Sequence, residues 1–306
     1  MKTIADRIAV VTGAGSGIGR ATSVALAERG AVLVLADIDQ SGMEETARMI
    51  AAAGGMVSCH QVNVADQEAM KTFAAEVERL HGRAHIVVNN AGIGILDDFV
   101  DSNLDDFRKV VDINLWGVVY GSKFFLPLML KAGEGHIVNI SSLAGIISTP
   151  GMVSYGTTKF AVRGFSESLR AELAGRNIGV TSVHPGMIRT NIAKASKVVD
   201  TALQGRMVEW FERYGRPPSL VANKIVAAIE SNRMRVLVTP ETYLMDAFKR
   251  TAPTLAEAFN AQFMNRFRKA INPQYGNRQA AKSDSGRPKK AASVPASSTE
   301  KSDLAA

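Results

Sequence analysis

Seven apolar segments of strand length alternate along this chain with longer stretches of helical periodicity, and this alternation leaves few folds open. The segments lie at 8–12, 32–36, 56–62, 85–88, 136–140, 178–183 and 235–238. Strands that alternate with helices form a parallel sheet covered by helices on both faces. Because such crossovers are right-handed, we predict an α/β fold: a Rossmann-like, doubly wound parallel sheet of about seven strands, with its ligand crevice at the carboxyl ends of the strands.

A glycine-rich turn joins the first strand to the helix that follows it. It consists of Thr12-Gly13-Ala14-Gly15-Ser16-Gly17-Ile18-Gly19. Glycines let the backbone approach a dinucleotide pyrophosphate closely, while free N–H groups and the helix dipole favour negative charge. Tight structural turns also use glycine, so the turn alone leaves both interpretations open.

Asp37 closes the second strand, about twenty residues after the glycine turn, where an acidic side chain can bond the ribose hydroxyls of an adenosine. Its charge would repel a 2′-phosphate, and neither Ser16 nor Ile38 supplies a cation. The pattern favours NAD over NADP. A plain aspartate at a strand exit is the structural alternative.

Tyr155 and Lys159 are four residues apart on an expected helix, so both side chains can point into one site. They follow Ser141-Ser142, which closes the fifth strand. A cation within about 4–6 Å favours the phenolate and brings its pKa nearer neutrality. A phenol so tuned can exchange the proton that accompanies hydride transfer at a carbonyl. Such a pair also occurs by chance on surface helices.

Together these motifs resemble the short-chain dehydrogenase/reductase family from about Arg7 to Thr190. Its TGxxxGxG pattern is met in the glycine turn, its NNAG by Asn89-Asn90-Ala91-Gly92, its YxxxK by Tyr155 and Lys159, and its PG motif by Pro185-Gly186 with the trailing Thr190.

The resemblance implies the catalytic set Asn114, Ser142, Tyr155 and Lys159. Tyr155 would exchange the proton, Ser142 hold the substrate oxygen, Lys159 lower the phenol's pKa and bind the nicotinamide ribose, and Asn114 support a water relay. The implied cofactor-binding residues are Gly13, Ser16, Gly17, Ile18, Gly19, Asp37, Asn63, Val64, Asn90, Ala91, Gly92, Tyr155, Lys159, Pro185, Gly186, Ile188 and Thr190. Asn63 departs from the aspartate that the family usually places against the adenine.

We expect residues 1–272 to form one NAD-binding domain, with a lid segment at about 190–216 and C-terminal helices at about 241–270. Residues 273–306 are expected to be a disordered basic tail, because they contain almost no large apolar side chains. The second C-terminal helix would carry a stripe of Leu255, Phe259, Phe263 and Phe267. We expect the stripe to pack on the body or on a neighbouring subunit; a basic amphipathic helix on a membrane is the alternative.

The formal charge of +7 is concentrated at the C-terminal end of the chain. Residues 1–245 hold 25 Lys/Arg against 24 Asp/Glu, whereas residues 246–306 hold 11 against 5. The nearly neutral body argues against a nucleic-acid partner. The five histidines lack metal-ligand spacing, so we expect no metal, and the single Cys59 is expected to be a small buried thiol.

No run of 18 or more apolar residues occurs, and strand-like sequence begins at Arg7, so we expect a cytoplasmic protein without a signal peptide. The expected helices 105–131, which Pro127 should kink or end, and 155–175 have apolar stripes wide enough for a core and a partner subunit. We therefore expect a homodimer or homotetramer.

These features predict an NAD-dependent oxidoreductase acting on the carbinol or carbonyl carbon of an apolar small molecule. The alternatives are an NADP-dependent carbonyl reductase and a nucleotide-sensing protein without turnover. Apolar residues expected along the crevice or lid are Ile93, Ile95, Leu143, Ile147, Met152, Met187, Ile192 and Met207. Arg189 would contradict an apolar site if it reached inward.

Overall fold

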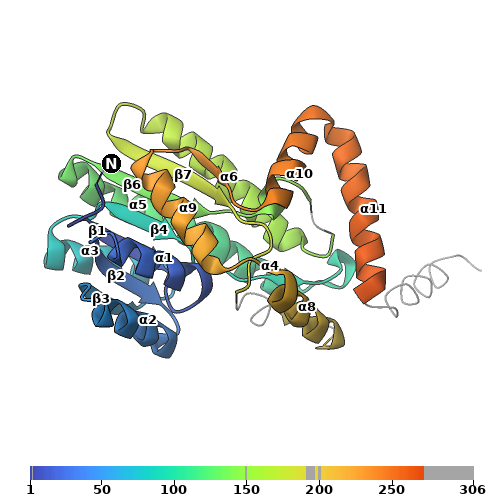
Figure 1. Ribbon diagram of the computed structural model, residues 1–306, viewed down its shortest axis with the longest axis horizontal. Helices are drawn as coiled ribbons and strands as arrows, with labels where there is room; N and C mark the ends of the chain where they lie inside the picture. The colour runs from blue at the N-terminus through green and yellow to red at the C-terminus, as the bar shows by residue number, and fades with distance from the viewer. Residues whose placement is uncertain (2, 149, 191–196, 199–200, 272–306) are drawn as a thin grey trace, which may run out of the picture.

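Seven parallel strands form one continuous sheet in this protein, whose computed structural model describes residues 1, 3–148, 150–190, 197–198 and 201–271. The strand order is β3-β2-β1-β4-β6-β7-β9 (Figure 1). The strands are β1 Ile8–Thr12, β2 Val32–Asp37, β3 Val57–Gln61, β4 Ile86–Asn89, β6 Gly135–Ile140, β7 Ile178–His184 and β9 Arg235–Leu237. The order reverses between β1 and β4, which confirms the predicted Rossmann-like, doubly wound sheet.

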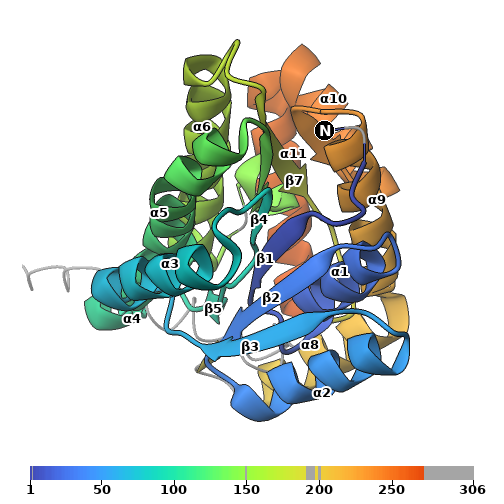
Figure 2. The same ribbon diagram turned by 90° about the vertical axis from the view of Figure 1, so that its left-hand side faces the viewer.

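Helices cover both faces of the sheet, as Figure 2 shows in a view along its edge. One layer contains α1 Gly17–Ala27, α2 Gln40–Ala52 and α9 Pro218–Glu230, and the other contains α3 Gln67–His81, α5 Gly117–Ala132 and α6 Val153–Glu172. Successive side chains of β1 point to opposite faces: Val11 joins the core under α1 and α9, whereas Val10 joins the core under α3 and α5. β1 and β2 are almost entirely apolar because both of their faces are buried, whereas β6 also buries His136 and Asn139.

The edge strand β3 corrects one prediction. Cys59 is exposed rather than buried. β3 pairs with β2 on one side only, and its burial alternates between partly buried and exposed residues. The run that suggested a buried strand therefore lies at the edge of the sheet, where none of the β3 residues is fully buried.

The predicted helix 105–131 is continuous but changes its winding. It consists of α4 Leu104–Val111, the π-helical segment η2 Asp112–Trp116 and α5. Pro127 lies inside α5, which runs on to Ala132, so the expectation that proline might end this helix is wrong. By length and composition alone the whole segment is long and apolar enough to cross a membrane, and 44% of its most apolar stretch is buried inside the protein. It packs against α3 and β4, as a core helix does.

Short elements complete the crevice side of the molecule. They are β5 Ile95–Leu96, η1 Phe99–Asp101, η3 Leu143–Gly145, β8 Lys197–Val198 and α8 Thr201–Tyr214. β5 and β8 pair in parallel, which the sequence did not reveal. Within the predicted lid, residues 191–196 and 199–200 lie outside the described residues, as does the predicted tail at 273–306.

Two C-terminal helices, α10 Pro240–Thr251 and α11 Pro253–Ile271, form a hairpin at the rim of the molecule (Figure 1). The guanidinium of Arg235 on β9 donates two hydrogen bonds to Asp246 on α10, at 2.6 and 2.9 Å, and Arg250 donates a third at 3.0 Å. Burial alone would raise the pKa of Asp246, but these hydrogen bonds and charges hold it below its usual value. The hairpin is thus attached to the sheet by a nearly buried ion pair.

The aromatic stripe of α11 does not pack on the body, contrary to one of our two expectations. Leu255, Phe259 and Phe263 are 65%, 52% and 55% exposed, whereas Ala256 is completely buried and Asn260 is 8% exposed. The side chain of Phe267 lies outside the described residues. The helix therefore turns its small and polar residues to the body and its large apolar residues outward.

We predict that Asp246→Asn lowers the free energy of unfolding at pH 7 by about 2–4 kcal/mol, because it leaves the Arg235 charge buried without a counter-ion. The folded pKa lies below the usual 3.8, so this contribution is complete above that value and is lost as the pH falls through the folded pKa. Urea denaturation of the wild type and of Asp246→Asn from pH 7 to pH 3 measures how far their free energies of unfolding differ, and whether this difference shrinks as the pH falls. Glu78→Gln, in an ion pair whose side chains are 47% and 61% exposed, is the control and should change stability by less than about 0.5 kcal/mol. A loss as small as the control's would contradict the role of Asp246.

Candidate active site

The crevice lies where β1 and β4 end side by side and the strand order reverses. Asn90, just after β4, donates from Nδ2 to the carbonyl oxygens of Thr12 at 3.0 Å and Gly13 at 3.1 Å. The Thr12 hydroxyl accepts hydrogen bonds from the backbone N–H groups of Asn90 and Ala91. These contacts attach the NNAG turn to the glycine turn, so the two motifs form one rigid wall.

The glycine turn has the shape needed to receive a pyrophosphate. Gly13 and Gly17 have φ values of +64° and +53°, in the left-handed region that favours glycine. A Cβ on Gly13 would lie 2.8 Å from the Cα of Ala91, and one on Gly19 would lie 2.0 Å from the Gly13 carbonyl oxygen. The first turn of α1 holds no acidic residue, and the Ser16 side chain does not cap it. Its N–H groups and positive dipole end therefore fit an anionic dinucleotide.

Asp37 lies beside this turn and supports it. Its Oδ2 accepts from the Gly15 N–H at 2.7 Å, and its Oδ1 accepts from the Asp39 N–H at 2.9 Å. A carboxylate oxygen accepts more than one hydrogen bond, so Asp37 keeps acceptor capacity for ribose hydroxyls. An open groove of about 570 Å³ runs from Gly15–Gly17 past Arg20 and Arg189.

Arg20 lines that groove, and three of its five N–H donors are used within the chain. Nη2 donates to the carbonyl oxygens of Gly15 and Gly42, and Nε donates to the Thr46 hydroxyl at 3.0 Å. Arg189 is exposed and lines the same groove, so it does not reach into an apolar crevice.

The four residues of the implied catalytic set come from three elements. Ser142 follows β6, Tyr155 and Lys159 lie on α6, and Asn114 lies in the π-helical segment η2. The Ser142 side chain is hydrogen-bonded to the phenol of Tyr155. The Lys159 ammonium lies over the Tyr155 ring, 5.4 Å from its centroid, and donates to the Ile140 carbonyl oxygen at 2.9 Å.

Asn114 approaches the same point from the opposite side. Its Oδ1 accepts from the Ile93 N–H at 2.8 Å, and its Nδ2 donates to the Ile93 carbonyl oxygen at 2.9 Å. A Cβ on Gly92 would lie 3.2 Å from Asn114 Oδ1 and 3.6 Å from Lys159 Nζ. Because Gly92 has no side chain, the Asn114 amide and the Lys159 ammonium can both lie beside its Cα. Asn114 can face this point because the π segment shifts it from the regular helical position, a distortion common at functional sites.

Burial dominates the electrostatics of this group. It raises the pKa of the Tyr155 phenol, while the hydrogen bond with Ser142 acts in the opposite direction. It also lowers the pKa of Lys159, which is 4% exposed, from 10.5 to about 8. The structure therefore does not show the lowered phenol pKa that the motif implied, because loss of solvent disfavours the charged forms of both groups.

Several supporting residues were not identified from the sequence. His184 contacts the Ser142 carbonyl oxygen through Nδ1 at 3.1 Å, and burial lowers its pKa to about 4, so the ring is neutral and donates there. Glu241, at the start of α10, accepts from the Met187 N–H at 3.2 Å beside the PG motif. No local sequence signal connects Glu241 with Met187, since 54 positions separate them.

Some of the remaining implied cofactor-binding residues have side chains that are buried or already hydrogen-bonded within the chain. Thr190 lies against Gly17, where an added Cβ would be 3.1 Å from its Cγ2, and Leu143 N donates to the Pro185 carbonyl oxygen. Asn63 accepts from the Ala65 N–H through its side chain, and the side chain of Val64 is buried against Gly117. The Ile188 side chain is buried in the core, so this residue offers the crevice its backbone.

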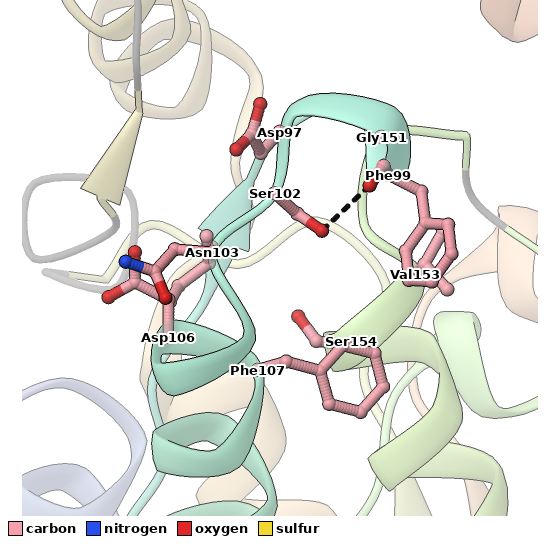
Figure 3. Close-up of a pocket in the computed structure, with 10 residues that line it drawn as sticks. Asp97, Phe99, Ser102, Asn103, Asp106, Phe107, Gly151, Val153 and Ser154 are labelled. Atoms are coloured by element: carbon pink, nitrogen blue, oxygen red, sulfur yellow. Dashed lines mark hydrogen bonds between the residues drawn. The ribbon is translucent and has the colours of Figure 1, made fainter.

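A small hollow lies between β5, α4 and the start of α6, where Val153 and Ser154 line it (Figure 3). Its volume of about 20 Å³ is that of a single water molecule. The apolar side chains around it are Ile95, Phe99, Phe107 and Val153, and the polar ones include Asp97 and Ser154. Of the other apolar residues expected along the crevice, Ile147 is buried, while Ile192 and the side chain of Met207 lie outside the described residues.

Sequence comparison places these motifs within known proteins. The family model of the short chain dehydrogenases matches residues 7–199, which include every motif described above. SadH of Mycobacterium tuberculosis (strain ATCC 25618 / H37Rv), which bears the name of an oxidoreductase, is 41% identical over 254 residues, covering 82% of this chain and 92% of SadH. A cyclohexanol dehydrogenase of Acinetobacter sp. (strain SE19) is 36% identical over 186 residues, covering 60% of this chain and 74% of that relative.

Solved structures agree with the sequence comparison. A short chain dehydrogenase/reductase from Burkholderia phymatum in complex with NAD has 30% identity and a TM-score of 0.78, covering 83% of this chain and 96% of its own. A metagenomic short-chain oxidoreductase in complex with NADP has 29% identity and a TM-score of 0.66, covering 78% and 99%. The similar structures thus include complexes with each of the two cofactors.

The lowered pKa of Lys159 predicts a pH-dependent stability. Between about 8 and 10.5 the unfolded chain binds more protons than the folded protein, so the free energy of unfolding should rise with pH across this window. Lys159→Met removes this dependence, whose full size is about 3 kcal/mol or less. Urea denaturation at several pH values measures the difference between the two proteins. Lys131→Met, at a side chain 61% exposed, is the control and should follow the wild type; parallel curves for wild type and Lys159→Met would refute the inference.

Proposed function

Because the chain belongs to the short-chain dehydrogenase/reductase family and is an NAD(P)-dependent oxidoreductase, we propose that it transfers a hydride between NAD and an apolar small-molecule alcohol or ketone. The observation that carries the proposal is one connected cluster: Ser142 is hydrogen-bonded to the Tyr155 phenol, Lys159 lies over the Tyr155 ring, and Lys159 and Asn114 meet at Gly92. A protein that only sensed a nucleotide would have no use for a partly buried phenol beside a buried amine.

In this proposal the substrate oxygen lies between the Ser142 hydroxyl and the Tyr155 phenol. The nicotinamide ring supplies or accepts the hydride at the neighbouring carbon when it is bound. As hydride reaches a carbonyl carbon, Tyr155 donates its proton to the oxygen; in alcohol oxidation it accepts that proton. The raised pKa of the phenol keeps it protonated and ready to donate before substrate binds.

In this proposal Lys159 and Asn114 help to carry the proton that Tyr155 exchanges with the substrate. Lys159 uses one N–H on the Ile140 carbonyl, so two donors remain for a ribose hydroxyl and for a water leading to Asn114. Its pKa of about 8 leaves the ammonium able to exchange a proton near physiological pH. Asn114 is held at both ends of its amide by Ile93, so it can order that water without moving.

Two observations support NAD over NADP. Asp37 places a negative charge at the end of β2, where a 2′-phosphate would be repelled. Arg20, a cation beside the glycine turn, has its described contacts with the Gly15 and Gly42 carbonyls and with Thr46. An NADP-dependent carbonyl reductase is the alternative, and the metagenomic relative in complex with NADP shows that the fold accommodates that cofactor.

An apolar substrate is supported by the residues that surround the reacting group. Partly buried Ile93, Leu143, Met152 and Met187 lie on the segments next to Ser142 and Tyr155. The name of the cyclohexanol dehydrogenase relative agrees with a secondary alcohol of this kind.

A homodimer or homotetramer completes the proposed molecule. On α4, η2 and α6, large apolar side chains are exposed, among them Leu104 at 60%, Trp116 at 45% and Phe160 at 40%. Trp116 stacks on Tyr120, and Tyr120 on Phe124, along the same helix. Such a surface is typical of a subunit contact.

A turnover screen tests the function. The wild-type protein should oxidise members of a panel of cyclic, aromatic and aliphatic secondary alcohols with NAD, whereas Tyr155→Phe should lower kcat by about 10²-fold or more. NAD affinity, measured by calorimetry, should be nearly unchanged because only the proton-transfer group is removed. Tyr243→Phe, at an exposed tyrosine on α10, is the matched control and should keep its activity. Nucleotide binding without turnover of any alcohol or ketone would favour the sensor instead.

Cofactor preference depends on the charge of Asp37. Asp37→Ala should reduce the ratio of kcat/KM with NAD to kcat/KM with NADP by about tenfold or more, because the repulsion of a 2′-phosphate disappears. Asp37→Asn keeps an oxygen that can accept the Gly15 N–H while removing the charge, so it separates repulsion from support of the glycine turn. Unchanged discrimination in both variants would assign the preference to another residue.

A further inference from the structure

The C-terminal hairpin carries a row of large apolar side chains that the proposed chemistry does not use, and all of them except the half-buried Phe248 are exposed. We call Leu244, Phe248, Leu255, Phe259 and Phe263 the apolar ridge. Leu255, Phe259 and Phe263 are four residues apart and therefore share one face of α11. The Phe259 ring contacts Phe248 of α10 at 6.0 Å and stacks on Phe263 at 6.2 Å between centroids. Contiguous apolar surface of this kind marks an interaction site.

The opposite face of the hairpin fixes the direction of the ridge. Asn260 donates to the Ser148 carbonyl oxygen, and Glu257 accepts from both the Ser148 hydroxyl and Lys249. Burial would raise the pKa of Glu257, but these partners hold it below its usual value, so it stays ionised. α11 is thus attached to the body through polar contacts. The ridge cannot turn inward without breaking them.

Cations accompany the ridge. Arg250, which also pairs with Asp246, lies in the last turn of α10, and Arg266 lies on α11 beyond Phe263; both are exposed. From Ala258 to the end of the chain there are nine Lys/Arg and three Asp/Glu, while residues 1–245 are nearly neutral. A second copy of the chain on this face would bring like charges together. An anionic surface would neutralise them.

We propose that the apolar ridge and its flanking cations dock this protein peripherally on an anionic phospholipid bilayer. Large apolar side chains on one face of a helix enter the boundary between headgroups and acyl chains, and basic residues bind the phosphates. The helix lies along the surface, and the body stays in water.

The position of the apolar ridge would bring a docked membrane close to the crevice. α11 contacts α8, within the predicted lid segment, and Ser148 follows Ser142 and η3 along the chain. A docked ridge therefore places the membrane beside the lid side of the crevice. This consequence rests on the proposed function, since an apolar alcohol or ketone partitions into a bilayer; the docking itself does not.

Co-sedimentation of the full-length protein with vesicles tests the proposal. Vesicles of phosphatidylcholine with phosphatidylglycerol should bind the wild type, vesicles of phosphatidylcholine alone should bind it at least about tenfold more weakly, and added salt should weaken binding. The triple variant Leu255→Ala, Phe259→Ala, Phe263→Ala should lose about tenfold or more in partition coefficient. Arg266→Glu should weaken binding to the anionic vesicles specifically. Phe99→Ala removes an aromatic ring that is 59% exposed elsewhere and should bind as the wild type does.

Circular dichroism and NAD binding check that each variant is folded. We expect the variants to fold because the substituted side chains are exposed. Absence of binding to anionic vesicles, or equal binding by the wild type and the triple variant, would overturn the proposal. So would a loss of self-association in the triple variant without any vesicle binding, which would assign the ridge to a contact between copies. Vesicle binding in a protein that turns over no alcohol or ketone would leave docking standing and overturn the proposed function alone.

Discussion

Parallel pairing of β1 with both β2 and β4 is the constraint on which the rest of this structure depends. Because the strand order reverses at β1, the connections after β1 and β4 leave in opposite directions and open a crevice between them. The glycine turn and the NNAG turn lie at the two sides of that crevice, and Asn90 and Thr12 join them. A dinucleotide site therefore results from strand order combined with residues that allow close backbone approach.

The proposed catalytic group is built on the next strand and helix, where burial disfavours the charged forms of its ionisable side chains. Lys159 is placed with its amine in an almost solvent-free position, held by the Ile140 carbonyl and facing the Tyr155 ring. Desolvation disfavours the charged form of both residues. An ionisable amine is therefore held here in surroundings from which protein cores usually exclude such groups. The π-helical segment that carries Asn114 is a second departure from regular structure at the same place.

The C-terminal hairpin extends this arrangement beyond the sheet. The Arg235–Asp246 pair attaches α10 to β9, Glu241 meets Met187 beside the PG motif, and Asn260 and Glu257 reach the loop after Ser142. One hairpin thus supports two sides of the crevice while presenting the apolar ridge outward. This geometry links the proposed membrane contact to the proposed substrate entrance.

The sequence by itself determined the seven-stranded sheet, the glycine turn at its first crossover and the helix that presents Tyr155 and Lys159 on one face, because these follow from local periodicity and spacing. Tertiary structure alone decided which faces were covered: Cys59 on the edge strand β3 is exposed, and the α11 stripe is exposed because Ala256 and Asn260 face the body. It also decided the contacts of Glu241 with Met187 and of His184 with Ser142, and the direction of the Tyr155 pKa shift. Burial and long-range contacts depend on how distant elements pack, and the order of residues along the chain does not specify that packing locally.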